Sequence, residues 1–153
     1  MLKSSLIAAV FAMGFSGASY AKTCNLTIEG NDAMQYSTKE LTIDSDCKNV
    51  SLTLKHSGKL PAAAMGHNWV LTKSADMQAV VAAGIKAGLA SNYVPKGDAK
   101  VIAATKLIGG GQSDTVTFSV EKLQQGGDYA FFCSFPGHSA MMSGKFVIKK
   151  PAA

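Results

Sequence analysis

Residues 133–142 read Cys133-Ser134-Phe135-Pro136-Gly137-His138-Ser139-Ala140-Met141-Met142. This stretch places a thiol, an imidazole and a thioether close together, and its Pro-Gly pair allows the chain to turn between them. It connects two segments, Tyr129 to Ser134 and Lys145 to Lys149, that have the residue spacing of β-strands. The sequence therefore predicts a short loop between two strands, with three potential metal ligands on it.

Strand-like segments of the same kind recur along the chain. Apolar residues alternate with polar ones in five further places, around residues 26–28, 41–43, 50–54, 69–73 and 116–120. Many short strands separated by turn-forming residues are typical of an all-β sandwich or barrel. A chain of 153 residues is long enough for one domain with a full core and too short for two of ordinary size.

One interval, residues 74–90, breaks the alternating pattern. It is rich in alanine, and Ser74 stands where a helix N-cap is expected. Four of its apolar residues recur at helical spacing: Met77, Val80, Val81 and Ile85. We therefore expect one helix inserted between strands.

The first 21 residues are typical of an export signal. Lys3 supplies the positive start, a short apolar run follows, and Ala18-Ser19-Tyr20-Ala21 ends in the small-x-small pattern of a cleavage site. The apolar run is shorter than a bilayer core, which favours a cleaved signal over a membrane anchor. We expect residues 1–21 to be removed, and residues 22–153 to form a single periplasmic domain without a membrane span.

Export also decides how the three cysteines are interpreted. An oxidising compartment allows two of them to pair. Cys24 and Cys47 are the natural pair, because both lie in the N-terminal third among polar and turn-forming residues. Cys133 is then the unpaired cysteine, close to a histidine and a methionine.

The charge of the chain argues against nucleic acid as a partner. The net charge of +5 includes Lys3, so removal of the signal leaves +5 − 1 = +4. Every basic residue is lysine, so no guanidinium is available for bidentate contacts to phosphate or guanine. We interpret the lysines as a solvated surface.

The 133–142 loop contains the donors that copper prefers. A blue copper site uses two imidazole nitrogens and one thiolate in a plane, with a weak and distant axial thioether. Cys133 and His138 would supply the thiolate and one imidazole. Met142 follows His138 by four residues, far enough along to return beneath the metal as the axial ligand.

The second imidazole must come from elsewhere in the chain. His67 is the better candidate, because Met65-Gly66-His67-Asn68-Trp69 begins a predicted strand, where a loop can present a ligand at the end of the sandwich. Gly66 lets the backbone approach closely, so its carbonyl oxygen could lie opposite the thioether. His56 continues the inward phase of its strand and is interpreted as a satisfied core histidine near the site.

Together, residues 65–69 and 133–142 resemble the copper motif of the azurin family, and the similarity extends from about Cys24 to Lys149. The resemblance implies an eight-stranded Greek-key sandwich of the cupredoxin type with an inserted helical flap, and a Cys24–Cys47 disulfide. It implies one copper ion, cycling between Cu(I) and Cu(II), with these ligands: Gly66, His67, Cys133, His138 and Met142.

Around the ligands, we expect Asn68 to bond across to Ser134 and so to join the two ligand segments. Backbone N–H groups near Asn68 and Phe135 would donate to the sulfur of Cys133. The family resemblance also suggests an exposed apolar patch around His138 for short-lived encounters.

The resemblance implies a monomeric one-electron carrier and not an enzyme. Its partners would be redox proteins such as c-type cytochromes or a copper or haem reductase. A copper enzyme would need a second metal centre, which three histidines cannot supply once two are used. A copper storage or delivery protein would need clustered, exchangeable Met or His donors, whereas the methionines here are scattered. A thiol nucleophile lacks a group to orient His138, and structural zinc favours four strong ligands.

Overall fold

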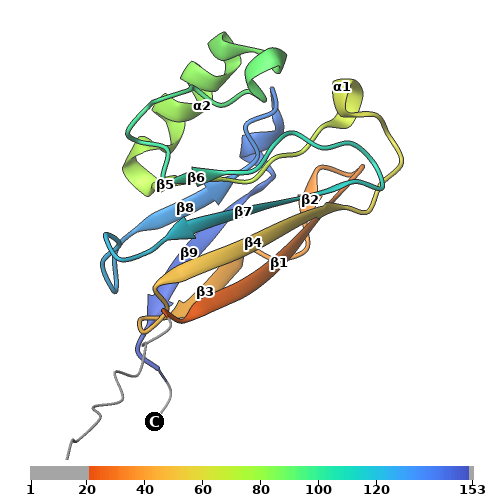
Figure 1. The fold of residues 1–153 in the computed structure, drawn as a ribbon. Helices are drawn as coiled ribbons and strands as arrows, with labels where there is room; N and C mark the ends of the chain where they lie inside the picture. The colour runs from red at the N-terminus through yellow and green to blue at the C-terminus, as the bar shows by residue number, and fades with distance from the viewer. Residues whose placement is uncertain (1–20, 152–153) are drawn as a thin grey trace, which may run out of the picture.

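The protein is a two-sheet β-sandwich (Figure 1). The structure is a computed structural model that describes residues 21–151. One sheet has the strand order β2-β1-β4-β7, formed by Gln35–Tyr36, Thr23–Asn31, Asn49–His56 and Ser113–Ser119. The other has the order β3-β9-β8-β5-β6, formed by Glu40–Asp44, Ser143–Lys149, Tyr129–Phe132, Val70–Lys73 and Ala103–Ala104.

Each sheet contains one parallel pair, which gives the sandwich its crossed connections. β1 runs parallel to β4, and β3 runs parallel to β9, while the other pairs are antiparallel. The predicted all-β sandwich is confirmed. The described residues form nine strands, where the family resemblance implied eight and the residue pattern indicated seven. The two that the pattern did not indicate are the two-residue strands β2 and β6.

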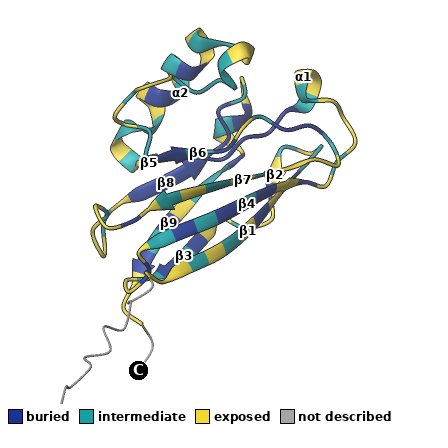
Figure 2. Cartoon of the chain, in the orientation of Figure 1, coloured by how far each residue is buried: buried dark blue, intermediate teal, exposed yellow. Residues whose placement is uncertain are grey.

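Alternation along the strands places the core between the sheets. In β4, Val50, Leu52 and Leu54 are fully buried and the residues between them are more exposed. β8 is buried at every position (Figure 2). The α2 region covers its outer side, because Val80 of α2 and Phe132 of β8 belong to the same core cluster. Burial of this much apolar side chain between the sheets is the main stabilising contribution to the sandwich.

The inserted helix is shorter than predicted. A 3-10 turn, η1 (Ser74–Asp76), leads into α2 (Met77–Ala87), and η2 (Leu89–Ser91) follows it. The prediction that Ser74 caps the helix was wrong: its hydroxyl donates to Asp128, and α2 begins after Asp76 without a side-chain cap. Gly88 ends the helix at a positive φ of 74°, a conformation that glycine adopts without strain. A second short helix, α1 (Ala62–Met65), was not predicted.

The expected cysteine pair is joined in the structure. A disulfide links Cys24 and Cys47 at the start of β1, and Cys133 is the free, buried cysteine. Of the predicted signal peptide, residues 1–20 lie outside the described residues. Between residues 21 and 151, no helix combines the length and the apolar character needed to cross a membrane.

Candidate metal centre

The expected ligands gather where several strands end on the same side of the sandwich. Cys133 directly follows β8, and His138 begins the 3-10 turn η3 (His138–Ala140). Met142 immediately precedes β9. His67 comes from the segment before β5 and is held by a bridge to Ile108 through two backbone hydrogen bonds. In Figure 1 this region lies between α1 and the α2 region, opposite the end at which β9 finishes.

Three donors converge to form a potential metal site. The nitrogen and sulfur donor atoms of His67, Cys133 and His138 all lie within 4.8 Å of one another. Cys133 Sγ is 3.9 Å from His67 Nδ1 and 3.7 Å from His138 Nδ1. All three residues are buried, with His67 and Cys133 fully enclosed and His138 3% exposed. One thiol and two ring nitrogens therefore face a common point away from bulk water.

The loop closes tightly around this point through its own backbone. Cys133 N–H donates to the carbonyl of Met142, and Met142 N–H donates to the carbonyl of His138. Gly137 has a positive φ of 83°, which lets the chain reverse between Cys133 and His138. The Pro-Gly pair in the sequence thus corresponds to a turn in the structure, with Gly137 at the position of positive φ.

The two axial candidates lie beside the same point. Met142 is fully buried in the core cluster that contains Cys133. The carbonyl oxygen of Gly66 is 3.9 Å from Cys133 Sγ. A side chain at position 66 would collide with the carbonyl of Ala62 and with Leu107, so only glycine fits there.

His67 is fixed by what its other ring nitrogen contacts. Nε2 lies 2.9 Å from the carbonyl oxygen of Asn31, which can only accept, so the proton is on Nε2. Nδ1 is then left as a lone-pair donor facing Cys133. A backbone contact of this kind sets both the tautomer and the orientation of a ligating histidine.

His56 is a core histidine with its hydrogen bonds satisfied, as the sequence indicated. Gly58 N–H donates to its Nδ1, and its Nε2 lies 2.9 Å from the carbonyl of Met65. Its ring stacks on that of His67 at a centroid distance of 4.3 Å. His56 therefore buttresses His67 and is not among the three converging donors.

Burial shifts the proton affinities of the three donors. It raises the pKa of the Cys133 thiol to about 11, partly opposed by the backbone N–H groups of Asn68 and Phe135. Burial lowers the pKa of His138 to about 4, assisted by the charges of His67 and His56. It also lowers the pKa of His67. Both imidazoles are therefore neutral at pH 7 and keep the lone pairs that a metal needs.

A buried polar network joins the two ligand segments. Asn68 is fully buried; its amide nitrogen donates to Ser134 Oγ at 2.8 Å, and its amide oxygen accepts from Ser134 N–H at 2.8 Å. The same nitrogen donates to the carbonyl of Asn92 at 2.7 Å. The contact between Asn68 and Ser134 was expected, whereas the part played by Asn92 was not.

Gly30 is a second residue that the sequence analysis missed. A Cβ atom there would lie 2.8 Å from His67 Cδ2 and 3.2 Å from the methyl group of Met142. The end of β1 thus packs directly behind two of the expected ligands. A glycine within a strand signals a close approach, but the sequence does not say what approaches it.

Part of the expected apolar patch near His138 is exposed. Met141 is 55% exposed and Leu60 is 42% exposed, while Met34 and Met65 are only half-buried. Ile85, expected on the buried face of the helix, is 48% exposed. Met141 therefore gives the ligand loop one exposed apolar side chain.

Comparison with known proteins agrees with this geometry. The family model for copper binding proteins of the plastocyanin/azurin family matches residues 22–149. An azurin from Achromobacter denitrificans is 57% identical over 142 residues, covering 91% of this chain and 95% of the relative. An azurin from Pseudomonas denitrificans is 58% identical over 126 residues, covering 82% and 98%. Azurin-1 from Alcaligenes xylosoxydans xylosoxydans is 60% identical over 121 residues, covering 79% and 94%.

The fold and the donor set define the class: a cupredoxin-type sandwich with a mononuclear site built from two imidazoles and a thiol. The chain belongs to the plastocyanin/azurin family of copper-binding proteins. The family, the relatives and the site together support a blue copper electron carrier.

Proposed function

We propose that the protein is a periplasmic one-electron carrier whose copper is held by five residues: Gly66, His67, Cys133, His138 and Met142. The observation that carries the proposal is the convergence of two ring nitrogens and one sulfur within 4.8 Å in a buried position. His67 and Cys133 are 66 residues apart in the chain, so the fold, and not their position in the sequence, brings them together.

The donors fit copper better than the other common metals. Thiolate and thioether are soft ligands that favour copper, whereas structural zinc sites use four strong Cys or His donors. Among the residues that the structure describes, three strong side-chain donors converge here, and a thioether and a backbone carbonyl lie beside them. When bound, copper would supply a single electron by cycling between Cu(II) and Cu(I).

The residues of the chain hold the site in one geometry. The carbonyl of Asn31 orients His67, and Asn68 fixes Ser134 beside the thiol. Met142 and Cys133 are fully enclosed, so water is kept from both. Donors that are positioned by protein contacts need little rearrangement when the charge at the site changes, which favours fast electron transfer.

Location and partners are part of the proposal. We propose that residues 1–21 direct export and that residues 22–153 act in the periplasm as a single domain. The apolar exposed side chains of Met141 and Leu60 suit brief contacts with redox proteins, such as c-type cytochromes or a copper or haem reductase. Because the site would pass electrons without binding a substrate, we propose a carrier and not an enzyme.

The test is the visible spectrum after addition of Cu(II) to residues 22–153. We expect an intense blue band that is abolished in Cys133→Ser, which removes the copper–thiolate bond. Met142→Leu should alter the band or the reduction potential, whereas the matched variant Met141→Leu, at an exposed neighbouring position, should leave both unchanged. Colourless copper binding, or a band that survives Cys133→Ser, would overturn the ligand assignment.

A further inference from the structure

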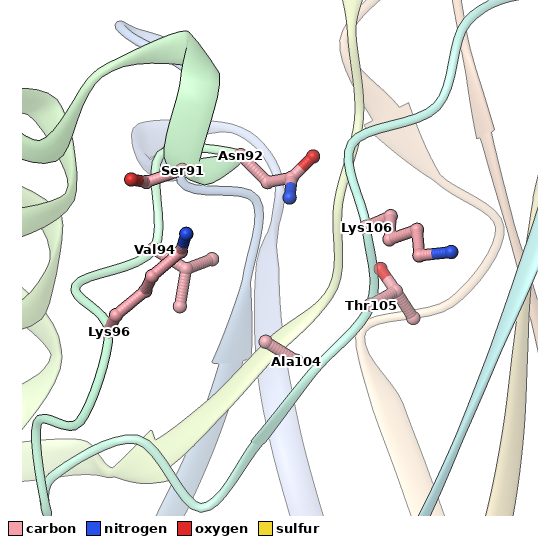
Figure 3. A pocket seen from close by; sticks show the side chains of 7 residues that line it. All are labelled: Ser91, Asn92, Val94, Lys96, Ala104, Thr105 and Lys106. Atoms are coloured by element: carbon pink, nitrogen blue, oxygen red, sulfur yellow. The ribbon is translucent and has the colours of Figure 1, made fainter.

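A hollow of about 210 Å³ lies beside the metal centre, between the segment that follows α2 and the segment that follows β6 (Figure 3). Ser91, Asn92, Val94 and Lys96 line it from the first segment, and Thr105 and Lys106 from the second. We propose that this hollow is a docking point for acidic side chains of the redox partner. The inference rests on the proposed function and adds the surface at which a partner binds.

The hollow carries positive charge without a matching carboxylate. Lys96 and Lys106 are both exposed, and neither ammonium group forms an ion pair within the described residues. Of the nearby acids, Asp98 lies 3.7 Å from the ammonium of Lys100, and Asp114 accepts the backbone N–H of Lys106. Figure 3 shows the two lysines on opposite walls, with the ammonium of Lys106 directed away from the hollow.

The polar floor of the hollow suits a protein partner better than a free anion. Thr105 Oγ1 accepts the backbone N–H of Trp69, and Asn92 Oδ1 accepts the backbone N–H of Leu107. These groups are thus already engaged and are not arranged to enclose phosphate. Leu89, two residues before the wall, is 50% exposed and adds apolar surface of the kind found in weak protein interfaces. Lysines on flexible stems then attract carboxylates without fixing them.

Two chains of contacts join the hollow to the site. Through hydrogen bonds, the carbonyl of Asn92 accepts from Asn68, which holds Ser134 next to the thiol. Through aromatic rings, Tyr93 packs edge-on against Phe135 at a centroid distance of 5.4 Å. Phe135 in turn lies 4.5 Å from the ring of His138. A partner docked at the hollow is therefore in contact with residues that reach a proposed ligand.

The step at this surface is a simple exchange. Copper held by His67, Cys133 and His138 would take up the one electron that the docked donor protein loses, with no bond made or broken and no proton moved. Charge attraction raises the rate of encounter, and a shallow, open hollow allows quick release. Both properties suit a carrier that must bind and leave at each turnover.

Docking can be mapped by NMR on the Cu(I) protein with hexacyanochromate(III), a paramagnetic and redox-inert trianion. We expect line broadening at the backbone amides of Asn92, Val94 and Lys106. It should vanish in the double variant Lys96→Gln/Lys106→Gln and persist in Lys122→Gln, an exposed lysine beyond β7 at the other end of the sandwich. Broadening that is strongest elsewhere, or unchanged in the double variant, would overturn the proposal.

Competition decides between a partner protein and a free anion. Hexaglutamate, a mimic of an acidic protein surface, should displace the probe at low ionic strength. If inorganic phosphate displaces it and hexaglutamate does not, the hollow is a small-anion site and the proposal is wrong.

Kinetics supply a readout that separates this inference from the proposed function. Reduction of the blue protein by hexacyanoferrate(II) should slow by about threefold or more in the double variant at about 0.01 M ionic strength, and the difference should disappear near 1 M. Lys122→Gln should match the unchanged protein. Equal rates for all variants would refute docking at the hollow while leaving the carrier function intact. The absence of a blue band from the unchanged protein would instead refute the function.

Discussion

The substitution Asn68→Ala tests how much one side chain stabilises the contact between the two ligand segments in the metal-free protein. Asn68 makes three hydrogen bonds, two buried ones with Ser134 and a part-buried one with the carbonyl of Asn92. Each contributes about 1 kcal/mol net, and leaving the N–H of Ser134 buried without a partner costs about 1–3 kcal/mol more. We expect the free energy of unfolding to fall by about 4–6 kcal/mol, a large part of the stability of a domain of this size.

The measurement is guanidinium unfolding of the metal-free protein, followed by far-ultraviolet circular dichroism. The control is Thr53→Val, which removes a 2.8 Å hydroxyl contact to Thr115 on the solvent side of the sheet. That substitution should cost less than about 1 kcal/mol, because water replaces the lost partner. If Asn68→Ala lowers the free energy of unfolding by no more than the control does, the network does not stabilise the contact between the two ligand segments. The argument from burial is then wrong.

Three further predictions follow from other parts of the molecule. Replacing Cys24 and Cys47 together by serine should lower the free energy of unfolding by about 3 kcal/mol, with the blue band unchanged because the disulfide lies at the far end of β1 from the site. Backbone N–H groups of the loop after β4 hold the pKa of Asp32 below its ordinary value of 3.8. The loss of stability caused by Asp32→Asn should therefore be constant above about pH 5 and should disappear as acid protonates the carboxylate. The measurement is unfolding of the metal-free protein as a function of pH. Gly66→Ala should destabilise by about 1–3 kcal/mol and shift the blue band, since the new methyl group meets Leu107; an unchanged spectrum would remove Gly66 from the site.

The sequence predicted those parts of the fold that depend on regular periodicity. In β4 the alternation of Val50, Leu52 and Leu54 with polar residues corresponds directly to burial between the sheets. The Pro-Gly turn of the ligand loop was also visible, because it requires a positive φ that the structure shows at Gly137. Both features depend on residues that are neighbours in the sequence, so the sequence alone is enough to predict them.

Features that depend on distant contacts were not predictable in the same way. Ser74 has the composition of an N-cap, but a partner 54 residues away, Asp128, takes its hydroxyl instead. Gly30 is required by His67 and Met142, neither of which is near it in sequence. The length of α2 was overestimated because the 3-10 turns on either side share its alanine-rich composition. The misses at Ser74 and Gly30 share a cause, because each depends on a contact with residues that are distant in the sequence.

The location of these contacts bears on how the site works. His67 is held by the carbonyl of Asn31 and stacked on His56, and Cys133 is held by a backbone bond to Met142. None of these restraints requires a metal, so the donors converge because the sandwich places them there. A centre assembled in advance by the fold has little freedom to change shape when its charge changes. The buried hydrogen bonds of Asn68 help to hold the two ligand segments rigid. This rigidity suits the site to passing electrons quickly.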